Sequence, residues 1–303
     1  MIDKKSLSWF LFIAFAISWV LFAAPLAAKN NPEIYVRLLF ALFALAMWGP
    51  GIAAIIVTLF IARQPFSSLR LNTLGPKRYY FWAWFLAPLI AVLTLGATIL
   101  LGTGTFDPTL SAIRQMMAQT PPTQTLPSTE TLLLLQSIFT LTLAPFINLV
   151  FALGEELGWR GFLLPKLLPL GEWKALLLSG AIWGFWHAPA IALHGHNFPQ
   201  HPYLGVLVMM IGCILLGIIF GWLYLKTRSP WAPALAHGAF NAIAPAAILF
   251  LHPEELDTAL GGNPLGLAGW VAMTVIILAL FALRQLGWQT SQQSVSAAGH
   301  TIH

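Results

Sequence analysis

Two adjacent acids, Glu155 and Glu156, stand at the end of a long apolar stretch and are followed by Arg160. Carboxylates at the C-terminal end of a helix oppose its dipole by about 0.3–1 kcal/mol each, so these two do not serve to stabilise the helix. Glu156 and Arg160 are four residues apart and can form an ion pair on one helical face. Glu155 points to a different face, lacks that partner, and is a candidate general base. The alternative is a purely structural ion-pair cluster of the three residues.

Two further motifs place histidines in later apolar stretches: Trp183-x-x-x-His187 and His237-x-x-x-Asn241. Residues four apart share a helical face, so each motif presents two side chains to one place. Pro189 predicts a kink beside His187 that leaves backbone groups to be satisfied by protein or water. Ionisable groups inside a membrane helix are costly and indicate function. A structural role in helix packing is the alternative for both histidines.

The three motifs combine into a set that can hydrolyse a bond. Glu155 and His187 can polarise a water, and His237 and Asn241 can bind a developing oxyanion. The alternative chemistry uses one divalent metal such as zinc, held by Glu155, His187 and His237 with a position open for water. We expect no other cofactor.

The composition identifies the elements that must position these residues as membrane helices. Of the 303 residues, 58% are hydrophobic and 8% are charged, with a mean hydropathy of +0.78, whereas soluble proteins carry roughly 25% charged residues. One cysteine excludes a disulfide framework and a cysteine-rich metal site. The net charge of +5 is spread along the chain and reflects topology, so we expect membrane lipid and no nucleic acid as a partner.

We predict an all-α polytopic membrane protein with about eight transmembrane helices, because each crossing needs about 20 apolar residues. The candidate spans are 8–27, 38–61, 80–102, 131–153, 174–193, 203–225, 232–251 and 265–283. Twelve of the 15 Lys and Arg residues fall on one side of this arrangement, and Lys29, Arg37 and Arg114 fall on the other. An excess of basic residues marks the cytoplasmic side, so we expect both termini and the opening of the site in the cytoplasm.

No internal repeat, soluble domain or linker is apparent, so residues 1–288 are interpreted as one membrane domain with the motifs in a core of about 131–251. Residues 289–303 are polar and are predicted to form a disordered cytoplasmic tail. Residues 160–173 mix Leu and Phe with basic residues, as in an amphipathic helix at a membrane interface. The expected location is a bacterial inner (plasma) membrane.

Several polar residues outside the motifs receive structural interpretations. His194, His196 and His201 cluster in a loop on the side with few basic residues, where we expect solvated side chains. Asp257 belongs to an acidic loop on the same side. Cys213 lies between apolar neighbours in the sixth span and is interpreted as a packing residue.

In order and spacing, the three motifs resemble the CAAX protease and bacteriocin-processing family (CPBP, Abi-type) of intramembrane endopeptidases, which includes the type II CAAX prenyl endopeptidases. The resemblance covers about residues 155–241, and an eight-helix layout suits the multi-helix core of the family. The second motif of the family usually begins with Phe, where this sequence has Trp183. Both residues are aromatic and suit the same packing position.

The resemblance implies an endopeptidase in which Glu155, assisted by His187, activates the attacking water. His237 and Asn241 would bind the oxyanion, and Glu156 would act with them in the catalytic site. The substrate would be a peptide or a membrane protein.

Arg160 and Trp183 would shape this site. Both glutamate-dependent and metal-dependent hydrolysis stay open under the resemblance, and we favour the glutamate-dependent reaction.

Other functions fit the sequence less well. The motifs His-Glu-x-x-His, Gly-x-Ser-Gly and Gly-x-Gly-Asp of other membrane proteases are absent from the sequence. A transporter or channel with a proton or ion pathway predicts matching polar groups in both halves of the chain, and the first 130 residues contain no such intramembrane acid or histidine. A non-catalytic immunity or scaffold protein predicts the loss of a motif residue, yet the set is complete. We therefore predict a CAAX-protease-like intramembrane peptidase.

Overall fold

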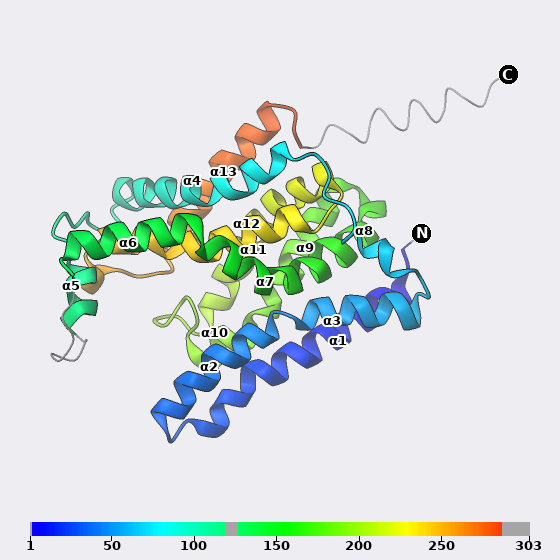
Figure 1. The fold of residues 1–303 in the computed structure, drawn as a ribbon, viewed down its shortest axis with the longest axis horizontal. Helices are drawn as coiled ribbons and strands as arrows, with labels where there is room; N and C mark the ends of the chain where they lie inside the picture. Colours follow the sequence, from blue (N-terminus) through cyan, green and yellow to red (C-terminus); the bar gives the residue numbers. More distant parts are fainter. Residues whose placement is uncertain (1, 119–126, 287–303) are drawn as a thin grey trace.

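The protein is described by a computed structural model over residues 2–118 and 127–286, and every regular element within these ranges is helical (Figure 1). One isolated antiparallel bridge joins Phe106 and Leu251. The predicted all-α membrane fold is confirmed. The tail predicted at 289–303 lies outside the described residues.

The α-helices are α1 (Lys4–Ala23), α2 (Pro32–Ala46), α3 (Gly49–Ile56), α4 (Arg78–Leu100), α5 (Ser111–Ala118), α6 (Thr129–Thr142), α7 (Ala144–Glu156), α8 (Leu164–Leu167), α9 (Glu172–Trp186), α10 (Ala188–His194), α11 (Leu204–Thr227), α12 (Trp231–Ile243) and α13 (Leu267–Ala282). π-Helical turns at Val57–Ile61 and Leu157–Leu163 continue α3 and α7. The 3-10 segments Ala24–Ala28 and Ala244–Phe250 extend α1 and α12.

Within the described ranges, six helical segments are long and apolar enough to cross a membrane: Lys4–Ala28, Pro32–Ile61, Arg78–Leu100, Glu172–His194, Leu204–Thr227 and Trp231–Phe250. A seventh crossing is possible if Thr129–Thr142 and Ala144–Leu170, which meet at a bend of 45°, form one span. The predicted eighth span coincides with α13, whose 16 residues are shorter than the roughly 20 that a crossing needs. The count is therefore six or seven, and the predicted eight is not confirmed.

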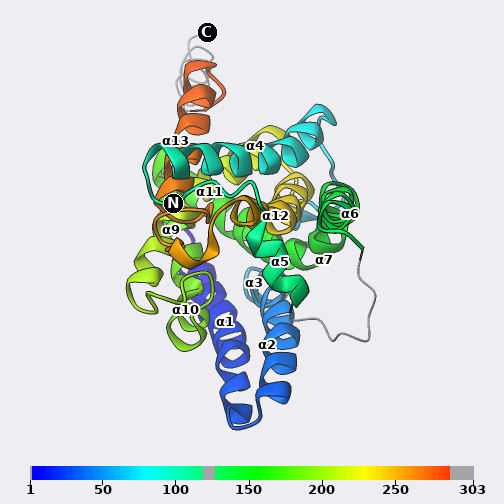
Figure 2. The same ribbon diagram turned by 90° about the vertical axis from the view of Figure 1, so that its left-hand side faces the viewer.

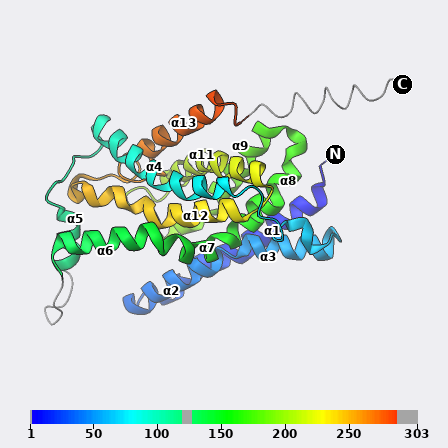
Figure 3. The same ribbon diagram turned by 45° about the horizontal axis from the view of Figure 1, so that its top comes forward.

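The helices form a bundle whose two ends differ. The start of α1 and the short α8 lie at one end, and α5 and the turn between α1 and α2 lie at the other (Figure 1). Helix α12 packs between α7 and α4 (Figure 3), and α11 packs along α9. The hairpin of α1 and α2 projects from the remaining helices in the view of Figure 2. Helices α7, α9 and α12, which carry the three motifs, are thus held in the interior.

The bend between α6 and α7 has an identifiable cause. Pro145 at the start of α7 has no backbone N–H, so the carbonyl of Leu141 loses its usual helical donor. The indole Nε1–H of Trp84 in α4 donates to that carbonyl at 2.9 Å instead. A freed backbone group inside a membrane must find a partner within the protein, and α4 supplies it here.

Glycines allow two helix pairs beside the motifs to approach closely. A Cβ added at Gly184 in α9 would lie 2.5 Å from Cα of Met210 in α11. A Cβ added at Gly154 in α7 would lie 2.8 Å from Cα of Trp48, next to α3. A side chain at either position would push the two backbones apart, so these glycines fix the spacing around the motif-bearing helices.

Candidate active site

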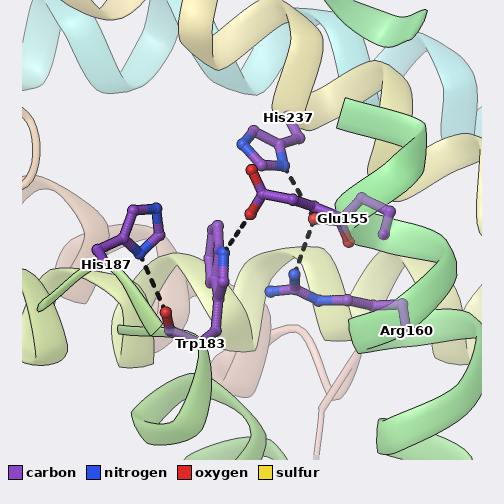
Figure 4. Close-up of polar contacts among 6 residues, drawn as sticks. Glu155, Arg160, Trp183, His187 and His237 are labelled. Atoms are coloured by element: carbon purple, nitrogen blue, oxygen red, sulfur yellow. Dashed lines mark hydrogen bonds and ion pairs between the residues drawn. The ribbon is translucent and has the colours of Figure 1, made fainter. Parts of the chain in front are cut away.

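Trp183 lies at the centre of a cluster formed by α7, α9 and α12 (Figure 4). Its indole Nε1–H donates to Oε2 of Glu155 at 2.6 Å, and both side chains are buried. Its ring centre lies 5.4 Å from the ring of His237 and 6.0 Å from the ring of His187. The fold therefore brings all three sequence motifs to one place.

Glu156 faces the opposite side of this cluster and binds two partners. Its Oε1 accepts a hydrogen bond from Nη1 of Arg160 at 2.8 Å, and Nδ1 of His237 lies 3.0 Å from the same oxygen. The guanidinium of Arg160 lies over the ring of Trp183 at 4.4 Å and near the ring of Phe220 at 5.4 Å. Glu156 and Arg160 are 0% and 1% exposed, so the predicted pair exists but is fully desolvated.

His187 sits at the interruption between α9 and α10, where the sequence predicted a kink at Pro189. Its Nδ1 lies 3.0 Å from the backbone carbonyl of Trp183. A carbonyl only accepts hydrogen bonds, so Nδ1 carries the proton and the neutral ring offers Nε2 as an acceptor. This backbone contact fixes which nitrogen of His187 is available for chemistry.

His237 and Asn241 project from α12 one turn apart. Because Nδ1 of His237 faces the carboxylate of Glu156, Nε2 is the ring nitrogen left for a ligand. Donation from Nε2 requires an imidazolium ring, and Glu156 is the negative charge beside it. The Asn241 side chain is exposed to the cavity described next, and its amide has no hydrogen-bond partner among the described residues.

A cavity of about 800 Å³ opens onto the cluster and is lined by Glu155, His187, His237 and Asn241. Most of its remaining wall is apolar and comes from Phe, Trp, Met and Leu side chains. Among the described residues that line it, Glu155 is the only Asp, Glu, Lys or Arg. A large apolar cavity with a few convergent polar groups is the usual form of a ligand or substrate site.

Comparison with known proteins finds two similarities. Residues 134–243, which contain every one of the predicted site residues, match the profile of the Rce1-like type II CAAX prenyl endopeptidases. That segment of the chain is therefore similar to this family. The chain is also 35% identical over 88 residues to CAAX prenyl protease 2 of Methanococcus maripaludis, an alignment that covers 27% of this chain. The aligned region spans about a third (32%) of the length of that relative.

The Rce1-like segment does not assemble the predicted metal ligands into a metal centre. Within residues 2–118 and 127–286, no three His, Cys, Asp or Glu side chains are placed together as a metal ion would require. Glu155 uses one oxygen to accept from Trp183, and His237 is turned by its contact with Glu156. Glu155, His187 and His237 are therefore not grouped as metal ligands in this arrangement, and a metal held by them stays a prediction.

Glu155 and Glu156 are enclosed by protein to a greater extent than the sequence predicted. Glu155 was expected at the membrane boundary, but the helix continues through the π-helical turn, and all residues from Gly154 to Leu164 are buried. The amphipathic interfacial helix predicted at 160–173 is wrong for its first five residues. The reason is that α3, α9 and α11 pack against this segment.

One polar residue of α7 that lines the cavity was not predicted. Asn148 lines the cavity from α7, seven residues before Glu155 and so on the same helical face. Its Nδ2 donates to the carbonyl of Ala144 at 2.9 Å. The spacing of seven between an amide and an acid in an apolar span was the available signal.

Of the three histidines predicted to be solvated, His196 is exposed, whereas His194 and His201 have partners within the protein. Nε2 of His194 lies 2.7 Å from the carbonyl of Phe22, and Nδ1 lies 2.6 Å from the hydroxyl of Tyr35. This ring therefore ties α10 to both helices of the first hairpin. His196 lines the cavity, with its ring 5.5 Å from that of Phe43.

The loop after α10 and the loop before α13 are fastened to each other. Oγ1 of Thr258 donates to the carbonyl of Asn197 at 2.8 Å, and Nε2 of His201 pairs with Oδ2 of Asp257 at 2.7 Å. Burial raises the pKa of Asp257, but hydrogen bonds from His201 and from a backbone N–H outweigh it and leave the pKa lowered. The acidic loop thus makes defined hydrogen bonds to the loop after α10.

Proposed function

We propose that the chain is an intramembrane endopeptidase that hydrolyses peptide bonds with a water activated by Glu155. The observation that carries the proposal is the placement of Glu155. One of its carboxylate oxygens is held by the indole N–H of Trp183, and the side chain lines a cavity that His187, His237 and Asn241 also line. The similarity of residues 134–243 to the type II CAAX prenyl endopeptidases supports peptidase chemistry for this set.

In the proposed reaction, Glu155 takes a proton from water as the oxygen of that water bonds to the peptide carbonyl carbon. Nε2 of His187 accepts a hydrogen bond from the same water and orients it. The carbonyl oxygen becomes an oxyanion, to which Nε2–H of His237 and the amide of Asn241 donate. When the C–N bond breaks, the proton held by Glu155 passes to the leaving amine, and the site returns to its starting state.

Two residues position this machinery without touching the substrate. Glu156 holds the ring of His237 by its Nδ1, and Arg160 neutralises the carboxylate of Glu156. Arg160 also lies against the ring of Trp183, the residue that holds Glu155. The proposed reaction therefore depends on one continuous buried network.

The cavity favours uncharged substrate residues next to the bond that is cut. Its wall is largely apolar, and the described part of its lining contains no Lys or Arg. Burying an unpaired charge there would be strongly unfavourable. We propose apolar peptides or membrane-protein segments as substrates. The printed name of the relative implies prenylated substrates for that protein, and a lipid chain is compatible with the same apolar wall.

The proposed location is the plasma membrane of a bacterium, as the sequence predicts. It is supported by the apolar helices and by the uneven distribution of basic residues between the two ends of the bundle.

The test is proteolysis by purified protein in liposomes that contain membrane-protein substrates with apolar segments. We expect Glu155→Ala and His187→Ala to lower kcat/KM by at least about 100-fold, the range of general-base catalysis. Glu33→Ala is the matched control, because Glu33 is a helical glutamate that is exposed and lies outside the cavity. Cleavage that persists in the first two variants would contradict the mechanism.

A further inference from the structure

The cavity lies on only one side of the Glu155 carboxylate along the bundle. On α7, which runs from the α5 end towards the α8 end, the lining residues are Asn148, Phe151 and Glu155. On α11, which starts from the loop 195–203, the lining residues lie between Met209 and Leu216, and none comes from its last eleven residues. On both helices the cavity is confined to the part of the chain nearest that loop.

The helices that run in the opposite direction show the same bias. On α9 and α10 the lining begins at Trp183, late in the span, and continues to His196 in the loop that follows. On α12 it begins at His237 and continues beyond the helix to Ile248. The lining residues on both sets of helices therefore show that the cavity extends from Glu155 towards the loops 195–203 and 252–266.

The other side of Glu155 is filled with protein. The chain from Gly154 to Leu164 is buried without interruption, and so are residues 216–224 of α11 and 232–240 of α12. This plug contains large side chains, including Trp159, which is 0% exposed. Among the residues of this plug, only Glu155, His237, Leu216 and Phe240 line the cavity. Water therefore has a route to the carboxylate from one end of the bundle and a wall at the other.

The charges identify which end is open. The plugged end carries the basic segments, including Lys4, Lys174 and Lys226 at the starts or ends of α1, α9 and α11. The open end carries Lys29, Arg37 and Arg114. Under the positive-inside rule the plugged end faces the cytoplasm. An opening towards the cytoplasm, expected from the sequence, would need a passage through the buried plug.

We propose that water and substrate reach Glu155 from the non-cytoplasmic side of the membrane, through the mouth formed by the loops 195–203 and 252–266 and the facing wall of α2. What enters as substrate rests on the proposed function, whereas the route itself does not. The substrate class is an uncharged peptide segment on the outer face or in the outer leaflet.

The chemistry of the mouth suits such a segment. His196, Asn197, Thr258 and Asn263 line this end of the cavity and offer neutral hydrogen-bonding groups. Phe40 of α2 lines the same cavity and is 72% exposed, so the wall facing these groups is aromatic and open. Neutral polar groups on one side and an apolar wall on the other match a peptide backbone with apolar side chains.

The mouth is also built to hold its shape. Nδ2 of Asn263 donates to the carbonyl of Asn197 at 3.2 Å, beside the bond from Thr258 to the same carbonyl. Nε2 of Gln200 donates to the carbonyl of Leu256 at 3.2 Å. Together with the pair of His201 and Asp257, these contacts join the two loops at several points, so the rim is a fixed part of the cavity.

The test is the side from which a cysteine in the cavity can be labelled. In a Cys213→Ala background, Ala44→Cys places a thiol on the cavity wall of α2. Tyr203→Cys, at a position 80% exposed in the outer loop, and Lys174→Cys, at an exposed position at the plugged end, report the two sides. Each variant is treated with a membrane-impermeant maleimide in sealed vesicles of right-side-out and inside-out orientation.

We expect Ala44→Cys to be labelled in the same vesicles as Tyr203→Cys, at least 10-fold faster than in those that label Lys174→Cys. Labelling from the Lys174 side would overturn the proposed route. Labelling only by a membrane-permeant maleimide, or by neither reagent, would overturn it too. Glu155→Gln in the same background should leave the labelling unchanged, because access does not need catalysis. A failure of the hydrolysis assay would therefore leave the route standing, and a failure of labelling would leave the hydrolysis standing.

Discussion

At the scale of single residues, Trp183 does more than fill space. Its N–H binds Glu155, its face carries the guanidinium of Arg160, and its backbone carbonyl orients His187. Phe, the usual residue of the family motif, could supply the face and the carbonyl but not the N–H. The hydrogen bond to Glu155 is therefore a property of this chain that the aromatic class of the residue does not reveal.

Trp183→Phe tests this hydrogen bond. A bond to a charged group contributes about 1.5–3 kcal/mol, so we expect kcat to fall roughly 10- to 100-fold while KM changes little. Trp186→Phe is the control, since Trp186 is a neighbouring buried indole whose Nε1 has no hydrogen-bond partner among the described residues. Equal losses in the two variants, measured by steady-state hydrolysis, would assign the effect to packing alone.

The buried pair of Glu156 and Arg160 leads to a prediction about stability. Removing one member of a buried ion pair leaves the other charge unpaired and destabilises by about 3–5 kcal/mol. We expect Glu156→Gln and Arg160→Met each to lower the thermal unfolding midpoint in detergent, and the double variant to be less destabilised than either single one. Glu33→Gln breaks an exposed pair of the same spacing with Arg37 and should lose at most about 1 kcal/mol. Additive losses in the double variant would refute the coupling.

The residue spacing predicted some of these contacts and missed others for a physical reason. The pair of Glu156 and Arg160 follows from helical periodicity, which is local. The contacts of Glu156 with His237 and of Glu155 with Trp183 join residues 81 and 28 positions apart, so they depend on how helices pack. The same applies to His194, whose partners lie in the first hairpin.

At the scale of helices, prolines and glycines decide where the site forms. The interruption at Pro189 was predictable from the sequence, because proline lacks a donor wherever it stands. Pro88, by contrast, stays inside the continuous helix α4. The π-helical turn after α7 was not predictable, since it depends on the burial of Leu157–Leu163 against neighbouring helices.

Gly154→Ala should disturb the site through α7 as a whole. An added Cβ would lie 2.8 Å from atoms of Trp48, which would force α7 away from the first helices. We expect a lower unfolding midpoint and a loss of hydrolysis. Gly96→Ala is the control: Gly96 lies in the membrane helix α4, has nothing within 4 Å of an added Cβ, and should gain up to about 1 kcal/mol from helix propensity. Equal behaviour of the two variants would contradict the packing role of Gly154.

At the scale of the whole molecule, composition and charge predicted a polytopic helical protein but not where its cavity opens. The number of crossings differs because α13 is short and α6 and α7 meet at a bend. The open end depends on which half of each helix is filled by neighbours, and a single span does not contain that information. The hydrogen bonds that join the loops 195–203 and 252–266 also connect segments about 60 residues apart.

The contact between the loops 195–203 and 252–266, which includes the pair of His201 and Asp257, has a defined pH dependence. The folded pKa of Asp257 is lowered below its ordinary value of 3.8, so its stabilisation is complete above that pH and is lost as pH falls further. We expect hydrogen exchange in 252–262, corrected for its intrinsic pH dependence, to accelerate as the solution is acidified below about pH 4. Asp257→Asn should show fast exchange in 252–262 both above and below about pH 4, while exchange in α11 stays slow at either pH. Loss of protection on raising the pH instead would contradict the sign.

The contact between Gly51 and Gly154 bears on how far the family segment is a unit of its own. A Cβ at Gly51 would lie 2.7 Å from the carbonyl oxygen of Gly154, so the backbones of α3 and α7 touch one residue before Glu155. The family match begins only at residue 134. The matched segment is therefore not a portable module. A chimera with a relative should exchange the first hairpin and α3 together with the motifs, since these helices pack against the part of α7 that carries Glu155.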